Sequence, residues 1–379
     1  MGEVMAVTPR DLLDAALEEA KLLKSSPGIS QKEIVTRIDY VCRCTSNRAG
    51  VRLLMSCMLA KMDHPEVDPR KPYTEIGGTD TFSGRTYDEQ FLTNFISTNR
   101  LRCNSTTAFL TPALRNHNIP LSIDNIPVGR PQQVYEDTLL LLDDVANGLV
   151  SAKQVLVETL RCLLVFGDEN QKRMKALIDS QQHNTGALPL ASEQIVTLLQ
   201  QHLACKHSSR LPVLIVAAAY QAAAESIGEQ TNPLLGHLAA DKQTGAGGDI
   251  EVFLTTDEQV VTIYEMKAKR VSCNDIDLAV EKIASRKPQV DNYVFITTDA
   301  IDARVAEYAA TFYEQTHGTE IAILDCMGFA RHFLHLFHRL RIQFLDFYQD
   351  MVLSEPDSAV NQPLKEAFLS LRQTAESDE

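Results

Sequence analysis

The chain has 379 residues, of which 44% are hydrophobic and 23% charged, and this mixture excludes a disordered, collagen-like or fibrous protein. The length has room for two or three domains. With 36 Lys and Arg against 50 Asp and Glu, the formal net charge of −14 excludes a positively charged coat that would bind nucleic acid indiscriminately. A local basic surface remains possible, because residues 43–130 hold eleven Lys and Arg against eight Asp and Glu.

Eight cysteines are scattered along the chain without the paired spacing of metal or redox motifs, and no signal peptide is expected. This usage predicts reduced thiols in the cytoplasm. The longest aliphatic run, residues 211–224, is shorter than the roughly 20 residues that cross a bilayer, so we expect no membrane span.

Residues 1–205 have mostly helical periodicity and predict a helical N-terminal domain. Thr8 and Pro9 mark the start of its first helix. Two long polar stretches interrupt the pattern: residues 63–85, which we expect to be loop, and 99–130, where short strand-like pieces alternate with turns. Because loops of this length in a compact domain are usually functional or disordered, this domain is a candidate for a recognition role.

Residues 206–340 predict a second domain, of α/β type. An apolar helix over 211–228 leads into the glycine-rich stretch 244–248, followed by two strands and then helix, strand, helix and strand. Residues 341–379 predict a C-terminal helix and an acidic tail that frays after Leu353.

Three ionisable residues of the α/β domain are expected to meet. Asp249 begins the first strand, and Glu265 and Lys267 lie near the end of the second. Because side chains alternate along a strand, Val261, Ile263, Glu265 and Lys267 should share one face, with Glu265 and Lys267 about 6.6 Å apart. The hairpin between the two strands would place Asp249 beside Glu265 and Lys267.

This constellation suits phosphodiester hydrolysis. Mg²⁺ bound by one or two carboxylates neutralises charge on the reacting phosphate, and Asp249 and Glu265 would be its ligands. Lys267 could stabilise the attacking water or a phosphoryl oxygen, and burial could lower its pKa enough for a share in proton transfer. Gly245, Gly247 and Gly248 would allow the tight turn or the close backbone approach that places Asp249.

The segment "GGDIEVF…YEMKAK" resembles the PD-(D/E)xK nuclease superfamily, with Gly248 at the position of the motif's usual proline. Together with "YEMKAKRVSCNDIDLAV" and the polar "TFSGRTYDE", it is similar to the SacI family of type II restriction endonucleases. The resemblance implies a nuclease core built on a mixed sheet flanked by helices. It also leaves Lys269 as a rival to Lys267 for the catalytic amine, since the two would share strand parity.

Two further carboxylates are candidate metal ligands. Glu225 sits at the polar end of the apolar helix, where a helix glutamate could join the metal site, although a solvent-facing carboxylate is equally common there. Glu251 shares the strand parity of Asp249 and is an alternative ligand. The histidines of "HFLHLFH" lack zinc-site spacing and are expected to be exposed on a helix.

Sequence-specific recognition requires Arg, Lys, Asn or Gln side chains at base edges, with other basic groups on phosphates. Lys269 and Arg270, beside the catalytic strand, are the expected phosphate contacts. The base-reading candidates in the two long loops are Arg85, Arg100, Arg102 and Asn104. Arg43, Arg48 and Arg52 follow near-helical spacing, which is also typical of an ordinary exposed face.

The sequence therefore predicts a Mg²⁺-dependent type II restriction endonuclease that cuts double-stranded DNA. Such an enzyme would act as a homodimer on a palindromic site, with a cognate DNA methyltransferase protecting host DNA. Two alternatives stay open: a repair or recombination nuclease of the same fold that recognises DNA structure, and a non-enzymatic helical interaction protein in which the α/β domain is only a scaffold.

Overall fold

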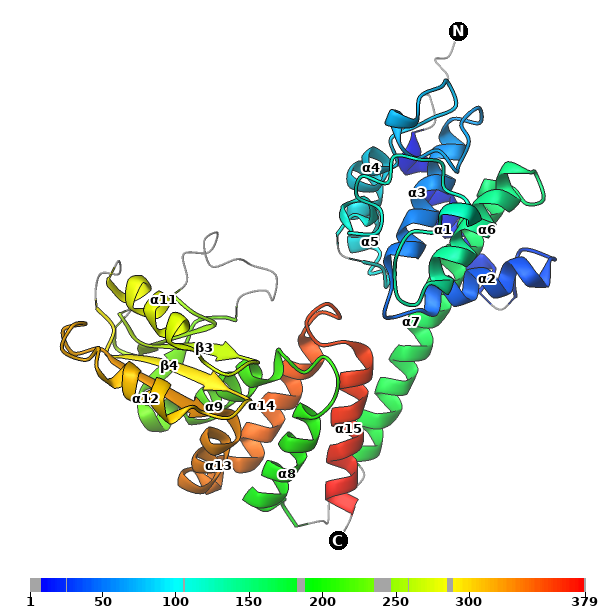
Figure 1. Cartoon of the computed structure of the whole chain (residues 1–379). Coiled ribbons are helices and arrows are strands. Elements are labelled where there is room, and N and C mark those ends of the chain that lie inside the picture. The colour runs from blue at the N-terminus through cyan, green and yellow to red at the C-terminus, as the bar shows by residue number, and fades with distance from the viewer. Residues whose placement is uncertain are drawn as a thin grey trace. The chain divides into compact units, whose positions relative to one another are not determined.

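A computed structural model of the chain describes residues 8–24, 26–104, 106–182, 188–234, 247–257, 259–284 and 289–377. The chain divides into two compact units, Met1–Arg173 and Met174–Glu379 (Figure 1). Each unit has its own buried apolar core.

The first unit is helical, as the sequence predicts. Thr8 caps its first helix through a reciprocal bond with Asp11, and Pro9 occupies the first helical position. The helices of this unit, with its short 3₁₀ and π turns, are α1 (Pro9–Leu22), α2 (Lys32–Arg43), α3 (Ala49–Asp63), η1 (Thr74–Ile76), α4 (Gly84–Tyr87), η2 (Asp88–Leu92), α5 (Thr93–Thr98), η3 (Ala108–Leu110), η4 (Ile123–Asn125), α6 (Gln133–Ala146) and the first part of α7 (Ala152–Gln182).

Helix α3 forms the centre of this unit, because every residue from Ala49 to Ala60 is buried. Arg52 is among them and is fully enclosed, so the exposed helical face suggested by its spacing is wrong at this position. The polar stretch after α3 is mostly loop, as predicted, although it contains η1 and α4 starts at Gly84 within it. The Asp68 amide donates to the Asp80 carbonyl at 2.8 Å. The described part of 99–130 contains 3₁₀ turns where strand-like pieces were expected.

The second unit contains all of the described strands. Its elements are α8 (Ser192–Leu203), α9 (Leu211–Ile227), β1 (Glu229–Thr231), β2 (Ile250–Leu254), β3 (Val260–Lys267), α11 (Cys273–Ala284), β4 (Asn292–Thr297), α12 (Ala303–Ala310), β5 (Glu320–Asp325), α13 (Cys326–Leu336), η5 (His338–Leu340), α14 (Arg341–Ser354) and α15 (Gln362–Ser377).

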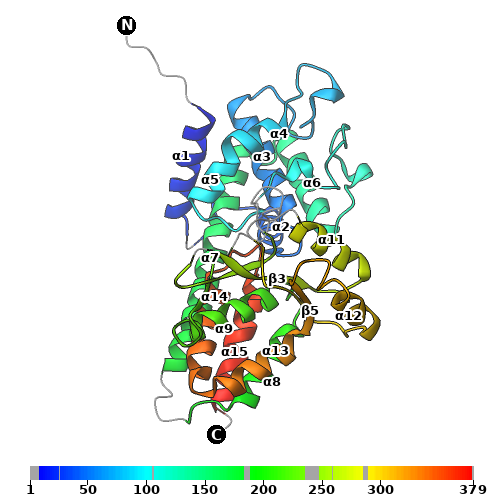
Figure 2. The same ribbon diagram turned by 90° about the vertical axis from the view of Figure 1, so that its left-hand side faces the viewer.

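These strands form one mixed sheet in the order β1-β2-β3-β4-β5. The pairs β1–β2 and β2–β3 are antiparallel, whereas β3–β4 and β4–β5 are parallel. Helices α11 and α12 cover one face, where Ile263, Tyr293 and Phe295 are buried. Helices α9 and α13 cover the other, where Ile250 and Tyr264 are buried, and α14 packs on α9 (Figures 1 and 2). The expected mixed sheet flanked by helices is therefore present.

A β-bulge interrupts the alternation expected along β3. Val252 pairs with Thr262 but Phe253 pairs with Val260, so Val261 is the extra residue. As a result Val260 packs on the α11 face and Val261 on the opposite face. Val261 therefore does not share a face with Ile263 as predicted, although the alternation resumes after the bulge.

The division between the units differs from the predicted boundaries at 205 and 340. Helix α8 packs on α13 and α15 of the second unit, and α14 packs on α9. Phe344, Tyr348 and Phe368, from the C-terminal helices, are fully buried in the same core as Leu199 of α8. The acidic end also does not fray after Leu353, because α15 continues the fold to Ser377. Amphipathic periodicity predicts that a helix has a buried face but not which core buries it.

All eight cysteines are free thiols. None of the helices in the described parts of the chain is long and apolar enough to cross a membrane.

Candidate functional site

Asp249 lies directly before β2 and beside the end of β3. Its amide donates to the Tyr264 carbonyl at 2.8 Å, and its carboxylate Oδ2 accepts from the Met266 amide at 2.7 Å. Because these two contacts flank Glu265 in the sequence, Asp249 is held next to Glu265. The residue is exposed at the surface of the unit.

Gly248 makes this close approach possible. A Cβ atom at this position would lie 2.7 Å from the Tyr264 carbonyl oxygen and 2.7 Å from a methyl carbon of Ile263. Since no real side chain tolerates such contacts, glycine is required where the motif usually has proline. Of the other two glycines, Gly247 supplies an amide and a carbonyl to nearby side chains, and Gly245 lies outside the described residues.

Glu265 is the centre of an ion-pair cluster on the α11 face of the sheet. Its Oε1 lies 2.7 Å from Lys267 Nζ, and its Oε2 lies 3.0 Å from Lys282 Nζ. The Tyr293 hydroxyl from β4 also donates to Oε2. The Glu265 side chain is only 17% exposed, so two ammonium groups and a phenol surround a largely enclosed carboxylate.

Lys267 is held from two sides. Besides Glu265, its Nζ contacts Asp275 Oδ1 of α11 at 3.0 Å. The other oxygen of Asp275 accepts from the Ser272 amide at 2.9 Å and from its hydroxyl at 2.6 Å, in the turn that starts α11. The helix start thus fixes Asp275, and Asp275 fixes Lys267 beside Glu265.

The electrostatics keep both members of the Glu265–Lys267 pair charged. Burial acts to raise the pKa of Glu265, but the hydrogen bonds from Lys267 and Tyr293 and the charge of Lys282 outweigh it, and the pKa lies below its ordinary value. Burial acts to lower the pKa of Lys267, but Glu265 and Asp275 outweigh it, and this pKa is raised. The prediction that Lys267 shares in proton transfer through a lowered pKa is therefore wrong, because the residue remains an ammonium.

Lys282, Asp275 and Tyr293 are members of the cluster that sequence reasoning missed. Asp275 and Lys282 are seven residues apart in a helical segment, so they occupy the same face two turns apart. That spacing, next to the buried Ile276 and Ile283, was a usable signal for a charged strip beside the sheet. Nothing in the apolar run of β4 distinguished Tyr293 from an ordinary core residue.

The other candidate ligands do not join this cluster. Among the described residues, no three His, Cys, Asp or Glu side chains are grouped so as to hold a metal ion. Glu225 is exposed on α9, which covers the sheet face opposite to Glu265. Glu251 accepts from the Gly247 amide at 2.8 Å and from the Asn232 side chain at 3.3 Å, which gives it a role in shaping the turn before Asp249. Asp249 and Glu265 remain as a pair of carboxylates.

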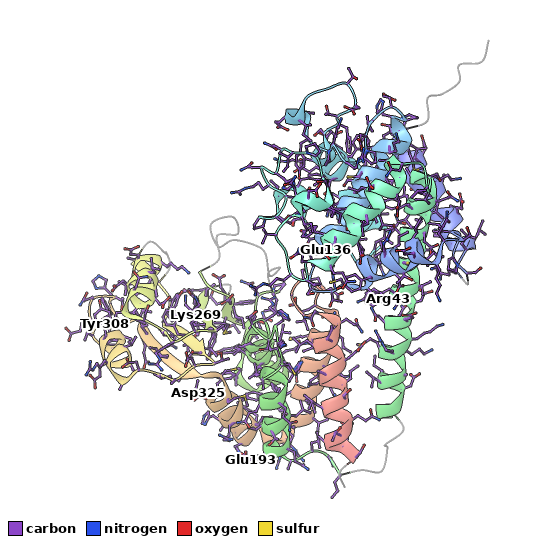
Figure 3. All side chains as sticks on the ribbon, turned by 45° about the vertical axis from the view of Figure 1, so that its right-hand side comes forward. Arg43, Glu136, Glu193, Lys269, Tyr308 and Asp325 are labelled. Atoms are coloured by element: carbon purple, nitrogen blue, oxygen red, sulfur yellow. The ribbon has the colours of Figure 1, made fainter. Side chains whose placement is uncertain are left out.

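Lys269 and Arg270 follow the end of β3, which stops at Lys267. Both are exposed, and the labelled Lys269 can be located in Figure 3. The Lys269 carbonyl accepts from the Thr297 hydroxyl at 3.1 Å, which ties the loop to the end of β4. Since Lys269 is in a loop, the strand parity that made it a rival to Lys267 does not apply.

The four base-reading candidates lie in the first unit. Arg85 on α4 pairs with Glu89 at 2.8 Å, and both side chains are about half exposed. Arg100 is exposed in the loop after α5 and has a left-handed backbone (φ 50°). Arg102 and Asn104 are half-buried in the same loop, and the Asn104 carbonyl accepts from the buried Arg52 at 2.6 Å.

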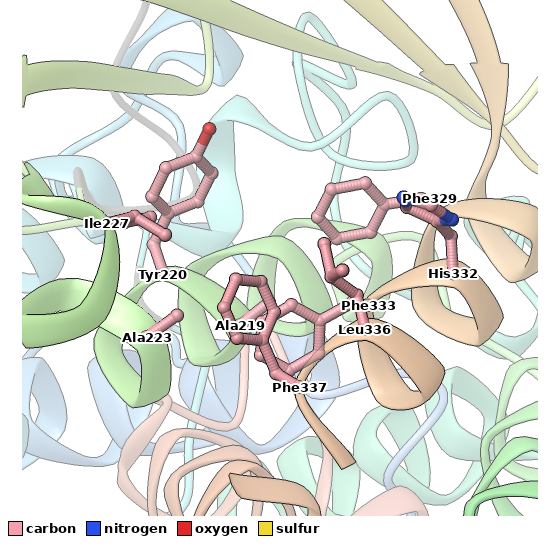
Figure 4. Close-up of a pocket in the computed structure, with 9 residues that line it drawn as sticks. All are labelled: Ala219, Tyr220, Ala223, Ile227, Phe329, His332, Phe333, Leu336 and Phe337. Atoms are coloured by element: carbon pink, nitrogen blue, oxygen red, sulfur yellow. The ribbon is translucent and has the colours of Figure 1, made fainter.

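An apolar pocket of about 150 Å³ in the second unit offers a different kind of site. Ala219, Tyr220, Phe329 and Phe333 are among its lining residues, which come from α9, α13 and the residue after α13 (Figure 4). The Tyr220 hydroxyl bonds to that of Tyr264 at 3.0 Å, on the face opposite to Glu265. The pocket holds none of the predicted site residues and no carboxylate.

Comparison with known proteins does not identify the chain: no family model matches it, and neither does any curated protein. The functional interpretation therefore rests on the geometry around Glu265.

Proposed function

We propose that this chain is a Mg²⁺-dependent endonuclease of the PD-(D/E)xK type, similar to the SacI family, that cuts double-stranded DNA at a short fixed sequence. One observation carries the proposal. Asp249 is bonded to the residues on both sides of Glu265, and Lys267 contacts Glu265 at 2.7 Å. Glu265 and Lys267 thus form an ion pair at the end of β3, and the backbone contacts of Asp249 hold that residue beside this strand end, in the sequence pattern D…E-x-K.

The two carboxylates suit a magnesium ion. Mg²⁺ commonly binds proteins through one or two carboxylates and keeps several waters for the remaining positions. Asp249 is exposed, and Glu265, although largely enclosed, has a lowered pKa and carries its charge. Asp249 and Glu265 would hold the ion, which when bound would neutralise charge developing on the phosphate.

Lys267 would act as a fixed positive charge. Its ammonium is positioned by Asp275 and Glu265, and its raised pKa keeps it protonated at neutral pH. Such a group stabilises an anionic transition state without reorganising, which is the basis of electrostatic catalysis. Its role is therefore to stabilise the phosphoryl oxygens, and another base or solvent would take the proton of the attacking water.

The substrate is assigned from the first unit and from the sequence resemblance. The positive balance of residues 43–130 favours an anionic partner within an acidic chain. Exposed Arg85 and Arg100 are available for DNA contacts. We further propose that the enzyme acts in the cytoplasm as a homodimer on palindromic DNA, alongside a methyltransferase that protects the host site.

Plasmid cleavage with purified protein and Mg²⁺, followed by sequencing of the ends, tests this proposal. Asp249→Ala should abolish cleavage while DNA binding persists, because removing a carboxylate near phosphate reduces repulsion. Asp257→Ala is the matched control, since Asp257 is an exposed aspartate in the turn at the far end of the same hairpin. Full activity in Asp249→Ala would refute the site.

The contacts of Glu265 also favour a second candidate function, a structural ion-pair network in a non-enzymatic protein. Both Glu265 oxygens already have hydrogen-bonding partners, as expected for a network that holds α11 on the sheet. In that case Glu265→Gln would lower thermal stability, and no preparation of the wild-type protein would cut DNA.

A further inference from the structure

Besides Lys267, a second lysine contacts the Glu265 carboxylate: the ammonium of Lys282, from α11. We propose that Lys282 of α11 is a catalytic residue. In the free protein its ammonium pairs with Glu265, and when a divalent cation replaces it there, the ammonium binds the phosphate of the substrate. The inference rests on the nuclease function proposed above and adds a residue from outside the D…E-x-K pattern.

The two lysines contact different oxygens of one carboxylate. Lys267 lies 2.7 Å from Oε1, and Lys282 lies 3.0 Å from Oε2. Both oxygens of the proposed metal ligand are therefore neutralised by protein cations. A divalent ion on Glu265 has to compete with at least one of these ammonium groups, because like charges that share one carboxylate repel each other.

The two ammonium groups differ in their exposure. Lys267 also contacts Asp275 at 3.0 Å and lies over the Phe295 ring, 5.9 Å from its centre. The side chain of Lys282 is more exposed than that of Lys267, 34% against 26%, and Lys282 lies in the last turn of α11. Its four-carbon stem allows the ammonium to move by several ångströms while the helix stays in place.

The charge balance indicates where the displaced ammonium would go. Asp249, Glu265 and Asp275 supply three negative charges, against two positive charges from Lys267 and Lys282. With a divalent ion held by these carboxylates the group would be net positive, and a phosphodiester anion would be its complementary partner. Lys282 would then lie beside the phosphate, where an ammonium stabilises charge that develops on its oxygens.

The proposal makes opposite predictions for metal binding and for cleavage. Lys282→Met removes a competitor from Glu265, so Mn²⁺ binding to the protein without DNA, followed by electron paramagnetic resonance, should tighten by about 2–5-fold, as expected for a partly exposed ion pair. The same variant should lower the single-turnover cleavage rate by about 10-fold or more. Lys282→Arg should retain more of the rate than Lys282→Met, because it keeps the positive charge.

Lys206→Met is the control, since Lys206 is an exposed lysine of the same unit that precedes α9. Weaker Mn²⁺ binding in Lys282→Met, together with a lower melting temperature, would assign a purely structural role and overturn the proposal. Tighter Mn²⁺ binding with an unchanged cleavage rate would leave Lys282 as a competitor only, and would also overturn it. A wild-type protein that cuts no DNA would instead refute the nuclease function itself, and the assignment of Lys282 would fall with it.

Discussion

At the scale of single residues, the structure separates two lysines that the sequence left as rivals. Lys267 ends β3 with its ammonium between Glu265 and Asp275, whereas Lys269 is exposed in the following loop. The difference arises because the strand ends between them, and parity applies only within a strand. Under the proposed nuclease function, Lys267 would therefore take part in the chemistry and Lys269 would contact a flanking phosphate.

Lys267→Met should reduce the single-turnover cleavage rate by about 10²-fold, the size expected when one transition-state donor is lost. Lys269→Met should leave the rate of bound substrate unchanged but weaken binding and reduce its salt dependence by about one counterion. Single-turnover kinetics and salt-titrated DNA binding measure both effects. A collapse of the rate confined to Lys269→Met would reverse the assignment.

At the scale of elements, two buried polar groups tie segments together that are distant in sequence. His202 of α8 donates from Nε2 to the Leu364 carbonyl at 3.0 Å, and its Nδ1 bonds to the Tyr348 hydroxyl at 2.9 Å. It thereby joins α8 to α14 and α15. In the first unit, the pair Arg52–Asp88 holds the loop after α5, because Arg52 also donates to the Asn104 carbonyl.

His202 makes the second unit sensitive to acid. Burial lowers the pKa of His202 to about 4, against 6.5 for an ordinary histidine. Between these values the unfolded chain binds more protons than the folded one, so stability falls as the pH falls. The loss should reach about 3 kcal/mol at pH 4. Urea denaturation from pH 7 to 4 should show a flatter dependence for His202→Gln than for wild type, whereas the exposed His332→Gln should behave like wild type.

The buried pair Arg52–Asp88 should be required for the stability of the first unit. Arg52→Met leaves the enclosed Asp88 without its counter-charge and should cost about 3–5 kcal/mol of unfolding free energy. Arg52→Met combined with Asp88→Leu removes both charges and should be closer to wild type. Urea denaturation of both variants decides the point. A double variant as unstable as the single one would show that the charge pair is not the anchor of this loop.

At the scale of the whole molecule, the chain forms two units with separate cores, and the second extends to the C-terminal helices. The core on the α9 face includes Leu199 from α8, Tyr348 from α14 and Phe368 from α15. These helices flank the α/β segment in the sequence on both sides. The α/β core is therefore stabilised by helices that precede it and follow it in the sequence.

A fragment of residues 206–340 should fail to fold cooperatively, because it lacks α8, α14 and α15 and exposes the apolar face that they cover. A fragment of residues 174–379 keeps that core and should unfold in one transition. Circular dichroism with urea titration distinguishes the two. Cooperative unfolding of 206–340 would contradict the observed packing. The 174–379 fragment should also lack sequence-specific DNA binding if Arg100 and Arg102 read bases.

The sequence by itself determined the helical first half, the mixed α/β segment and the shared face of Glu265 and Lys267, because periodicity and strand alternation are local properties. The expectation that Asp249 joins them in a metal site stays a prediction. Only the tertiary structure decided which core α8 joins, that Arg52 is buried, and that Lys282 and Tyr293 contact Glu265. It also decided the charge state of Lys267, which depends on Asp275 as well as on burial. These features arise from contacts between segments far apart in the chain, and local patterns do not specify such contacts.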